Sequence, residues 1–553
     1  MFLNFNAFNM NIAIAQLNYH IGNFEYNTKK IHDAISTAIA QHANLIVFSE
    51  LSVCGYPPRD FLEFSDFLEQ CNQIILSLLP LSNQIAILIG APSKNQRIEG
   101  KDLYNSAFLL HQAKILSTHH KALLPTYDVF DEYRYFEPAT QFKTVQLFDK
   151  KIAIVLCEDM WNVGNENPLY TVCPLDEVMH EKPDFIINLS ASPFDYNHAA
   201  DRIKVLQANV ERYKIPVIYC NQVGANTELV FDGGSLVLNA AGSVVMELPY
   251  FEECVRTVQI ELISTLKPQL NSKNKPELIY KALVCGVKDY FEKSNFKKAT
   301  LGLSGGIDSC LTLVIAVEAL GKDNVLPVLM PSEYSSEHSV SDSVLICEKL
   351  GVKYEILSIE RIYATFLSTL NELFAGSSFG VAEENLQSRS RAVLLMALCN
   401  KLGYILLNTS NKSELAVGYG TLYGDMCGGV GVLGDVYKTE VYDLARFVNK
   451  SVEIIPSHCI EKPPSAELRP NQKDSDSLPP YAVLDALLYQ YIEQSKGPKE
   501  LLALGFDGEL VQRVLRMVNQ AEHKRHQAPP IIRVSSKAFG SGRKLPIVAN
   551  YLV

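Results

Sequence analysis

Residues 302–309, which read Gly-Leu-Ser-Gly-Gly-Ile-Asp-Ser, constrain the fold of this chain more than any other segment. They overlap the end of a short apolar run at 299–303 and precede an apolar-rich segment at 310–320 that can continue as a helix. A strand, a tight glycine turn and a helix together direct several backbone N–H groups and a helix N-terminus toward one anion. The serines and glycine amides of this loop could therefore bind a pyrophosphate, and Asp308 adds a carboxylate where Mg²⁺ would bind.

The loop differs from the phosphate loop of the common nucleoside triphosphatases, because it contains no Gly-x-x-x-x-Gly-Lys-Ser/Thr. The motif Ser-Gly-Gly-x-Asp-Ser instead resembles the loop of the ATP pyrophosphatases. That resemblance implies an enzyme that splits ATP into AMP and pyrophosphate and adenylates an oxygen. The alternative is a glycine-rich turn without a ligand, but six specified positions between a strand and a helix favour the nucleotide site.

Composition limits the number of domains and the kinds of partner. The chain has 553 residues, which is too many for one ordinary core, so we expect two domains. Hydrophobic residues make up 47% and charged residues 20%, which is typical of a globular protein. The formal net charge of -11 argues against a general nucleic-acid-binding protein, which usually presents a basic face. We therefore expect no nucleic-acid partner, although a locally basic pocket could bind an anionic substrate.

The apolar runs and the cysteines bear on location. No apolar run approaches the roughly 20 residues that cross a bilayer, so we expect no membrane partner. Residues 1–10 carry no Lys or Arg and no cleavage-like ending, which argues against a secretory signal. Met10 stands directly before the first strand-like run, so either Met1 or Met10 could be the start. The 12 cysteines are scattered without a Cys-x-x-Cys pair, which indicates reduced thiols in a cytoplasmic protein.

The N-terminal half contains many short apolar strands between amphipathic stretches. This pattern predicts a stacked αββα sandwich rather than a simple parallel alternation of strands and helices. The segment 264–276 is polar, holds two prolines and has no helical stripe, so it is the best candidate for a linker. We place the N-terminal domain at 10–262, the linker at 263–276 and the C-terminal domain at 277–553.

In the C-terminal half, strands alternate with helices. This alternation predicts a doubly wound parallel sheet. Ligands of such sheets bind beyond the C-terminal ends of the strands, and the 302–309 loop lies at the C-terminal end of one strand. Two stretches have the composition of mobile lids or of idle surface loops, namely 375–384, rich in Gly and Ser, and 457–480, rich in Pro. The main elements are expected as strands at 299–303, 325–330, 354–357 and 404–408 and as helices at 277–291, 310–320, 339–350 and 385–402.

Three polar segments of the N-terminal half carry candidate chemistry. Glu50 follows one apolar strand, Cys157 ends another, and Lys121 lies between them in the sequence. Hydrolysis of an amide needs a nucleophile, a proton carrier and a donor for the oxyanion, and Cys157, Glu50 and Lys121 supply these in turn. A nearby lysine would favour the thiolate, although a cysteine at the end of a buried strand is most often a packing residue.

The same segments resemble the nitrilase superfamily, whose Glu-Lys-Cys triad has this order and sequence context. The resemblance covers about residues 10–262 and implies a glutaminase with Glu132 as a second, orienting carboxylate. The family usually has Lys or Arg where this chain has His198, so Arg202 or Lys204 could instead bind the carboxylate of glutamine. The glutamine-binding residues implied by the resemblance are Tyr127, Ser192 and His198.

The C-terminal half carries a second set of polar residues. The segment 408–414 (Asn-Thr-Ser-Asn-Lys-Ser-Glu) follows a buried-looking strand, where polar groups can cap the next helix or bind a ligand. Glu414 with Asp308 would give the paired carboxylates that Mg²⁺–ATP needs, although Glu414 could equally lie on the surface of a helix. The segment 524–530 (Lys-Arg-His-Gln-Ala-Pro-Pro) could meet a phosphate, although most basic clusters form a solvated face.

These segments, in their order from the 302–309 loop to Lys524, resemble the synthetase domain of the glutamine-dependent NAD synthetase family. The resemblance covers residues 277–540. It implies that Asp308 and Glu414 hold Mg²⁺, and that Lys438 meets a phosphate of ATP. The residues it implies for deamido-NAD, the nicotinic acid form of NAD, are Asn385, Glu414 and Lys524. The residues it implies for ATP are Gly302, Leu303, Ser304, Gly305, Gly306, Ile307, Asp308, Ser309 and Thr409.

Together the resemblances imply a ligase of NAD biosynthesis. The N-terminal domain would hydrolyse glutamine through a Cys157 thioester and release ammonia. The C-terminal domain would use ATP and Mg²⁺ to adenylate the nicotinate carboxylate of deamido-NAD, and ammonia would displace AMP. The expected partners are the small molecules deamido-NAD, ATP and glutamine, together with further copies of the chain in a dimer or larger homo-oligomer.

Two other functions stay open at this stage. One is an amidase or nitrilase whose C-terminal domain senses a nucleotide without chemistry, which the intact Asp308 and Glu414 argue against. The other is an amidotransferase of the same loop type that makes GMP or asparagine, although its glutaminase would normally be of a different kind. Pyrophosphate release, and a choice among deamido-NAD, XMP and aspartate, would separate the three.

Overall fold

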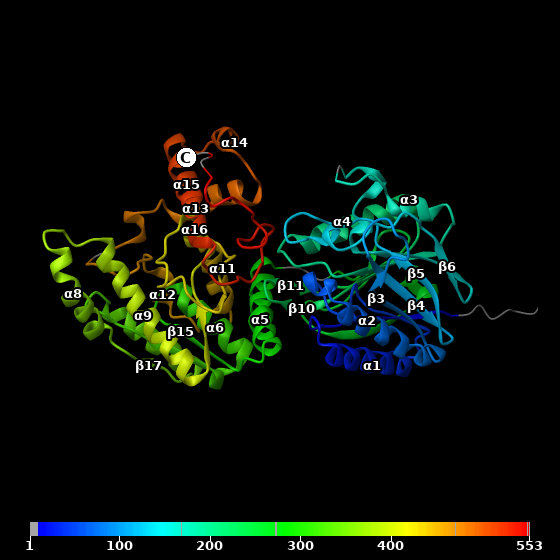
Figure 1. Cartoon of the computed structure of the whole chain (residues 1–553), viewed down its shortest axis with the longest axis horizontal. Coiled ribbons are helices and arrows are strands. Elements are labelled where there is room, and N and C mark those ends of the chain that lie inside the picture. The colour runs from blue at the N-terminus through cyan, green and yellow to red at the C-terminus, as the bar shows by residue number, and fades with distance from the viewer. Residues whose placement is uncertain (1–8, 168, 271–273, 471, 550, 552–553) are drawn as a thin grey trace, which may run out of the picture. The chain divides into compact units, whose positions relative to one another are not determined.

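A computed structural model describes residues 9–167, 169–270, 274–470, 472–549 and 551 (Figure 1). The chain divides into two compact units, Met1–Ser272 and Lys273–Val553. The segment predicted as a linker includes the end of a 3₁₀ helix, Ile260–Thr265, and helix α5 begins at Lys275. Residues 271–273 of that segment lie outside the described residues, and so do residues 1–8 of the predicted N-terminal extension.

Two six-stranded sheets form the centre of the N-terminal unit. Each sheet has three parallel strands in its middle and antiparallel strands at its edges. The first sheet has the order β14 (Cys254–Gln259), β1 (Asn11–Gln16), β2 (Leu45–Val47), β3 (Ala86–Lys94), β4 (Leu103–His111) and β5 (Lys114–His120). The second has the order β13 (Val244–Glu247), β12 (Leu236–Leu238), β9 (Val217–Asn221), β8 (Phe185–Ser190), β7 (Lys150–Leu156) and β6 (Thr144–Leu147).

The alternation of side chains between the two faces of each strand explains why the sheets stack. Successive side chains of a strand point to opposite faces, so both faces of a fully apolar strand can be buried. In β1, Ile12 and Ile14 pack in the core shared with Ile154 of the second sheet, whereas Ala13 and Ala15 face the core under helices. The result is four layers, which confirms the predicted αββα sandwich.

Helices cover the outer faces of this sandwich (Figure 1). Helices α1 (Phe24–Ala40) and α2 (Ser65–Leu78) share a core with the first sheet. Helices α3 (Pro174–Met179) and α4 (His198–Tyr213) share a core with the second sheet. A separate hairpin consists of β10 (Val223–Asn226) and β11 (Leu229–Asp232).

The C-terminal unit contains a five-stranded parallel sheet, and the predicted doubly wound sheet is confirmed. Because β15 pairs with both β16 and β18, the chain winds outward from the middle of the sheet in both directions. Helix α6 packs against β15 and β16, and α9 packs against β15 and β18. The strand order is β17 (Glu355–Ile356), β16 (Val325–Leu329), β15 (Lys298–Gly302), β18 (Tyr404–Asn408) and β19 (Val430–Gly431).

The helices of this unit fall into two groups. The first group belongs to the sheet: α5 (Lys275–Lys293), α6 (Ile307–Leu320), α7 (Glu337–Leu350), α8 (Glu360–Phe374), α9 (Val381–Leu402) and α11 (Lys438–Val448). The second follows or flanks it: α10 (Lys412–Val417), α12 (Ser457–Glu461), α13 (Tyr481–Leu488), α14 (Pro498–Ala503), α15 (Gly508–Gln520) and α16 (Glu522–Arg525). Helices α10, α13 and α15 share a hydrophobic core of their own.

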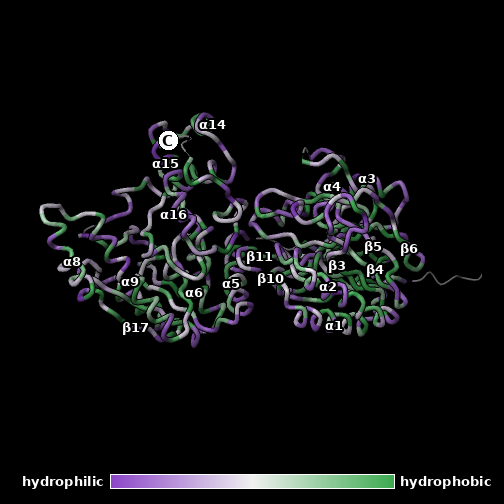
Figure 2. The backbone as a smooth tube through the Cα atoms, in the orientation of Figure 1, coloured by the Kyte–Doolittle hydropathy of each residue, from purple (hydrophilic) through white to green (hydrophobic). Residues whose placement is uncertain are grey.

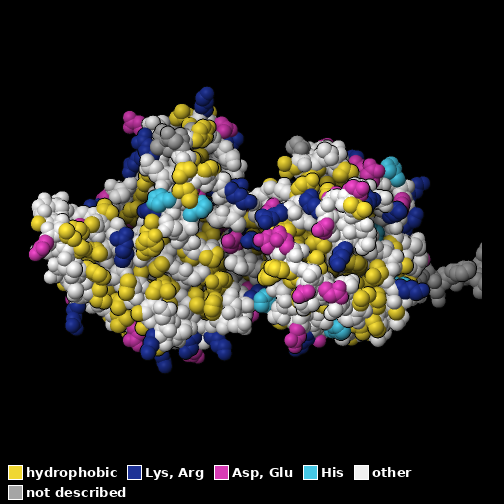
Figure 3. Space-filling view, viewed as in Figure 1, with side chains coloured by type: hydrophobic (Ala, Val, Ile, Leu, Met, Phe, Trp, Pro, Cys, Tyr) yellow, Lys and Arg dark blue, Asp and Glu magenta, His cyan; other side chains and the backbone are white. Residues whose placement is uncertain are grey.

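Hydropathy and charge follow this division into interior and surface. Figure 2 shows hydrophobic segments along the interior strands β3 and β4 and along α6, whereas the outer side of α1 is largely hydrophilic. On the face shown in Figure 3, acidic and basic side chains are interspersed over both units. Among the described residues, every helix is too short or too polar to span a bilayer.

Candidate active sites

The three candidate catalytic residues of the N-terminal unit all lie just beyond the ends of strands. Glu50 follows β2, Lys121 follows β5, and Cys157 follows β7. Cys157 has a φ of 39° and begins a 3₁₀ helix, Cys157–Met160. A positive φ costs free energy in a residue with a Cβ. Packing of the thiol alone would not require this backbone conformation, so the turn itself positions Cys157.

A buried lysine joins two carboxylates at this site. The Nζ atom of Lys121 lies 2.7 Å from Oε1 of Glu50 and 2.8 Å from Oε1 of Glu132. Burial alone would lower the pKa of Lys121, but the charges of Glu132 and Glu50 outweigh it, so the pKa is raised and the ammonium persists. Burial raises the pKa of Glu132 to about 7 against the pull of Lys121.

Further hydrogen bonds fix the orientation of the two carboxylates. Asn105 donates from Nδ2 to Oε1 of Glu50 over 2.7 Å, and the backbone N–H of Ala191 donates to Oε2 over 3.0 Å. The Tyr56 hydroxyl donates to Oε1 of Glu132 over 2.8 Å. Sequence reasoning missed Asn105 and Tyr56, since a polar residue within a strand and a tyrosine before a proline carry no local sign of such a role.

Burial dominates the electrostatic environment of Cys157. Burial, followed by the charge of Glu50, raises the pKa of the Cys157 thiol well above its ordinary value, although Lys121 pulls it down. Lys121 does favour the thiolate, as the sequence predicts, but desolvation outweighs this one cation and the thiol keeps its proton. The sulfur needs a base at the moment of attack, and a carboxylate of this site can take the proton.

The residues predicted to bind glutamine form two contacts, one of them to Glu158, the residue after the candidate nucleophile. The Tyr127 hydroxyl donates to Oε1 of Glu158 over 2.9 Å, and the Tyr170 hydroxyl donates to the same oxygen over 2.7 Å. Ser192 Oγ lies 2.6 Å from Nε2 of His198. Glu158 and Tyr170 were missed in the sequence, although Glu158 directly follows Cys157.

The two alternative cations for the glutamine carboxylate already have other partners. Arg202 is buried and donates to Asp232 over 2.8 Å and to the carbonyl of Gly233 over 3.2 Å. Lys204 has a side chain 74% exposed and pairs with Asp201. The His198 ring instead stacks on Trp161 beside Ser192. This arrangement favours His198 and Ser192 over Arg202 and Lys204.

The second candidate site lies at the C-terminal end of the parallel sheet. The 302–309 loop connects β15 to α6, with Gly306 as the residue before the helix. Gly305 has a φ of 73°, and a Cβ there would come within 2.3 Å of the carbonyl oxygen of Ser339. Only glycine fits so close an approach, so Gly305 lets the loop pack against the backbone of α7.

A lysine lies between the two candidate metal-binding carboxylates. Lys438 forms an ion pair with Oδ2 of Asp308, and its Nζ atom lies 3.6 Å from Oε1 of Glu414. Asn411 caps α10 and donates to Oδ1 of Asp308 over 2.9 Å. Burial and the charge of Asp308 raise the pKa of Glu414 to about 8. Two carboxylates from separate elements thus converge on one cation, an arrangement that suits Mg²⁺ with ATP phosphates as further ligands.

A cavity of about 720 Å³ in the C-terminal unit brings the predicted residues together. Of the nine residues predicted to contact ATP, all except Gly305 line it. Asn385, Glu414 and Lys524, predicted for deamido-NAD, line it as well, and so does Lys438. Among the described residues, no group of three or more His, Cys, Asp or Glu side chains is arranged to hold a metal by itself.

Lys524 and Arg525 of the basic cluster after α15 do not form a solvated face. Lys524 donates to the carbonyls of Gly418 and Gly420, each over 2.8 Å. Arg525 is buried and donates to the carbonyls of Leu415 and Ala416 at the end of α10. Both cations therefore hold the C-terminal end of the short helix that carries Glu414, and Lys524 also reaches the cavity wall.

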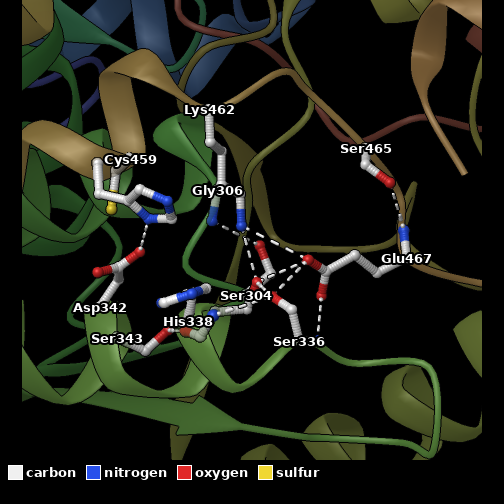
Figure 4. A network of polar contacts seen from close by, with 12 residues as sticks. Ser304, Gly306, Ser336, His338, Asp342, Ser343, Cys459, Lys462, Ser465 and Glu467 are labelled. Atoms are coloured by element: carbon white, nitrogen blue, oxygen red, sulfur yellow. Dashed lines mark hydrogen bonds and ion pairs between the residues drawn. The ribbon is translucent and has the colours of Figure 1, made fainter. Parts of the chain in front are cut away.

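The proline-rich segment 457–480 is held by polar contacts to the start of α7 (Figure 4). Glu467 accepts hydrogen bonds from Oγ of Ser339 over 2.7 Å and from Oγ of Ser336 over 3.1 Å. Lys462 donates to Oγ of Ser339 over 2.7 Å. The other predicted loose stretch, 375–384, already contains the start of α9 at Val381.

Fold and sites together define a carbon–nitrogen hydrolase joined to a nucleotide-dependent synthetase. A family model described as carbon-nitrogen hydrolase matches residues 11–267, and one described as NAD synthase matches residues 279–528. The chain is 44% identical to a glutamine-dependent NAD(+) synthetase of Synechocystis sp., over 98% of this chain and 99% of that protein. It is 38% identical to one of Thermotoga maritima, again over 98% and 99%. The chain belongs to the glutamine-dependent NAD(+) synthetase family, which confirms the predicted membership.

Solved structures are similar over the whole length. The glutamine-dependent NAD+ synthetase from Acinetobacter baumannii in complex with ADP has a TM-score of 0.78 and 36% identity, and the match covers 98% of this chain and 99% of that one. The synthetase from Cytophaga hutchinsonii has a TM-score of 0.84 at 19% identity and covers 98% of both chains, which shows a shared fold.

Proposed function

We propose that this enzyme makes NAD⁺ from deamido-NAD, ATP and glutamine, and releases AMP, pyrophosphate and glutamate. A free carboxylate is a poor acceptor for an amine, so it must first be given a good leaving group. The C-terminal site would supply that group as AMP, and the N-terminal site would supply ammonia. The observation that carries the proposal is the presence, in one chain, of the Glu50–Lys121–Cys157 site and of the phosphate-loop cavity.

In the N-terminal unit, Cys157 would attack the side-chain amide of glutamine. Because the thiol is protonated at rest, Glu50 would take its proton and pass it to the leaving ammonia. Lys121, which stays charged, would stabilise the oxyanion of the tetrahedral intermediate. Water would then hydrolyse the thioester to glutamate, with Glu50 again accepting a proton. Glu132 would keep Lys121 in place through the 2.8 Å ion pair.

The glutamine itself needs partners for its two charged ends. Glu158 is buried beside Cys157 and receives two tyrosine hydroxyls, from Tyr127 and Tyr170, so its carboxylate is fixed where it can pair with the α-ammonium. Ser192 and His198 would contact the α-carboxylate from the other side. A substrate that lacks the α-ammonium would leave the Glu158 carboxylate without a cationic partner and would bind poorly.

In the C-terminal unit, the 302–309 loop and Thr409 would hold ATP along the cavity. The backbone N–H groups at the start of α6 favour the negative phosphates. The nicotinate carboxylate of deamido-NAD would attack the α-phosphorus, and pyrophosphate would leave. Asn385 and Lys524, on the cavity wall, would contact deamido-NAD. Ammonia would then attack the acyl carbon and release AMP.

Mg²⁺ fits the donor set of this chain. The carboxylates of Asp308 and Glu414 converge on the Lys438 ammonium, which supports a cation site between them. Asp308 and Glu414 would hold the ion together with phosphate oxygens of ATP, and Lys438 would turn toward the phosphates. A bound Mg²⁺ would neutralise the charge that develops on the leaving pyrophosphate.

Product analysis tests the proposal. Purified enzyme with deamido-NAD, ATP, Mg²⁺ and either glutamine or ammonium should yield NAD⁺, AMP and pyrophosphate in equal amounts. Glutamine hydrolysis without pyrophosphate release would favour an amidase with a nucleotide-sensing domain. Amidation of XMP or aspartate in place of deamido-NAD would favour another amidotransferase.

The proposal also includes a homo-oligomer of two or more copies and a cytoplasmic location, both expected from the sequence. Light scattering of the purified enzyme tests the first, and fractionation of cells that express it tests the second. A monomeric mass at assay concentrations would remove the oligomer from the proposal.

A further inference from the structure

Two cysteine side chains meet beside the phosphate loop. Cys310 lies in the first turn of α6, directly after Ser309, and Cys459 lies in the short helix α12. The Cys310 thiol points at the sulfur of Cys459, with the two Sγ atoms 3.8 Å apart. The residues are 149 positions apart in the sequence, so only the fold brings them together.

One cysteine of this pair lines the nucleotide cavity. Cys459, which is 1% exposed, lines the cavity of about 720 Å³, together with Lys462 one turn further along. Cys310 does not line it and is 0% exposed. A small, neutral oxidant of about the size of water can therefore reach Cys459 through the cavity and would meet Cys310 only afterwards.

Hydrogen bonding also distinguishes the two sulfurs. The contact with Cys459, together with burial, raises the pKa of the Cys310 thiol well above its ordinary value. Cys310 therefore keeps its proton and donates, while Cys459 receives the hydrogen bond. This asymmetry is what a reactive cysteine and its resolving partner need.

We propose that Cys459 and Cys310 form a redox modification site, at which hydrogen peroxide converts the two thiols into a disulfide. The Cys459 sulfur attacks one peroxide oxygen, the O–O bond breaks, and the thiol proton leaves with the other oxygen as water, which gives a sulfenic acid. The Cys310 sulfur then attacks the sulfenic sulfur, the S–O bond breaks, and a second water leaves with the Cys310 proton. Two thiols and one peroxide thus give one disulfide and two waters.

The movement required is small. A disulfide has an S–S distance of about 2.05 Å, so sulfurs now 3.8 Å apart must approach by roughly 1.8 Å. Rotation about the side-chain bonds and a slight shift of α12, a helix of 5 residues, can supply this.

The disulfide would tie the two sides of the nucleotide pocket together. On one side, α6 carries Cys310 and follows the phosphate loop. On the other, the chain after Cys459 reaches Lys462 and Glu467, which contact the side chain of Ser339 at the start of α7 (Figure 4). The loop glycine Gly305 itself packs on the backbone of Ser339. A shift of α12 toward α6 therefore alters the geometry around the phosphates, and a positional error of this size costs about 10- to 100-fold in rate.

The chain contains a matched control pair. Cys54 and Cys71 also contact each other, and both are 0% exposed in the apolar core of the N-terminal unit. Neither of them lines the nucleotide cavity. If contact between thiols were sufficient for oxidation, both pairs would react. If access through the nucleotide cavity decides, only Cys310 and Cys459 will react.

Peptide mapping of the peroxide-treated full-length enzyme tests the site. We expect one cross-linked peptide that joins Cys310 to Cys459, two hydrogens lighter than the sum of its parts and reversed by dithiothreitol. Cys459→Ser and Cys310→Ser should each abolish it, and no peptide should join Cys54 to Cys71. Absence of the Cys310–Cys459 peptide from oxidised wild-type enzyme, or equal formation of both cross-links, would overturn the proposal. These masses do not depend on the proposed activity.

A second measurement follows the functional effect, which does rest on the proposed function. Synthesis with ammonium avoids any need for the Cys157 thiol, and each protein is compared with its own reduced form. Peroxide should lower the rate of wild-type enzyme about 10- to 100-fold, with recovery in dithiothreitol. Cys459→Ser should lose no activity that dithiothreitol restores. Equal, reversible losses in wild type and Cys459→Ser would contradict the proposed effect on the nucleotide pocket.

Discussion

The two candidate sites of this chain use a buried lysine between two carboxylates in opposite ways. In the N-terminal unit, Lys121, Glu50 and Glu132 have side chains 0%, 0% and 6% exposed, and further donors complete the set. In the C-terminal unit, Lys438 is 3% exposed, but its partners Asp308 and Glu414 are 17% and 19% exposed and face a cavity. The first arrangement is closed before any substrate arrives, whereas the second leaves room for phosphates and a metal ion.

This difference reflects the chemistry of each half. Amide hydrolysis needs fixed hydrogen-bond donors and a base around the small side chain of glutamine, so a rigid site closed to water suits it. Adenylation brings two large, highly charged substrates together, so its charges must rearrange when they bind. The comparison predicts that changes in the triad act on one half reaction and on stability, and that changes at Asp308 and Lys438 act mainly on nucleotide chemistry.

The largest expected effect comes from removing the thiol. Cys157→Ala should lower glutamine-dependent synthesis by about 10⁴-fold or more, because no nucleophile remains. Ammonium-dependent synthesis should persist, since the other site is untouched. Cys173→Ala is the matched control, because both cysteines are 6% exposed in the same unit. Loss of both activities in Cys157→Ala would contradict the separation of the two half reactions.

The reverse case is the removal of a carboxylate from the C-terminal site. Asp308→Asn should lower synthesis with either nitrogen donor by about 10²- to 10³-fold, because one of the two carboxylates that would hold Mg²⁺ is lost. Glutamine hydrolysis alone, measured as glutamate release, should change little. Asp443→Asn, at a carboxylate 58% exposed that pairs with Arg446, serves as the control. Unchanged synthesis in Asp308→Asn would remove this residue from the nucleotide site.

Stability should separate the two lysines. Lys121→Met leaves Glu50 and Glu132 buried without their cation, which should destabilise the N-terminal unit by about 3–5 kcal/mol. Lys438→Met should cost the C-terminal unit clearly less, since Asp308 and Glu414 reach water in the cavity. Urea unfolding, followed by hydrogen exchange in each unit, measures both. Similar losses for the two variants would show that the closed and open sites do not differ as described.

The smallest effect concerns pH. The pKa of Glu132 is raised to about 7 by burial, above an ordinary value of about 4.5, so the folded state binds this proton more tightly than the unfolded state. The resulting stability is fully present below about pH 4.5 and is lost as pH rises to about 7, in total about 3 kcal/mol. Glu132→Gln should remove this slope from the unfolding free energy of the N-terminal unit. Identical slopes for both proteins between pH 5 and 7 would refute the assignment.

Much of the fold was predictable because it rests on local periodicity. Side chains alternate between the two faces of strands such as β1, and both faces are buried. Strands that alternate with helices on both sides of residues 302–309 specify the parallel sheet. Helix α8 and the helical group at α13–α16 were not predicted. Their positions depend on a core shared by α10, α13 and α15, which are spread over about a hundred residues of sequence. No short stretch of sequence reveals such a core.

The sites divide in a similar way. The candidate catalytic residues at the ends of strands, Glu50, Lys121 and Cys157, stand in recognisable local contexts. Their supporting residues do not: Asn105 and Tyr170 are ordinary in the sequence and gain a role only through contacts 2.7 Å long with Glu50 and Glu158. The basic cluster at Lys524 and Arg525 was open to two readings, because its partners are backbone carbonyls in a distant segment.

The sequence by itself determined the two-unit architecture, the glycine loop and the residue types needed for hydrolysis and adenylation, because each depends on short-range pattern. Tertiary structure decided which charged side chains are buried and which are exposed to solvent. It showed that burial outweighs Lys121 in setting the state of Cys157, and that Lys438 lies between Asp308 and Glu414. It also brought Cys310 and Cys459 together. Desolvation and through-space contact depend on neighbours far away in the chain, so no local pattern encodes them.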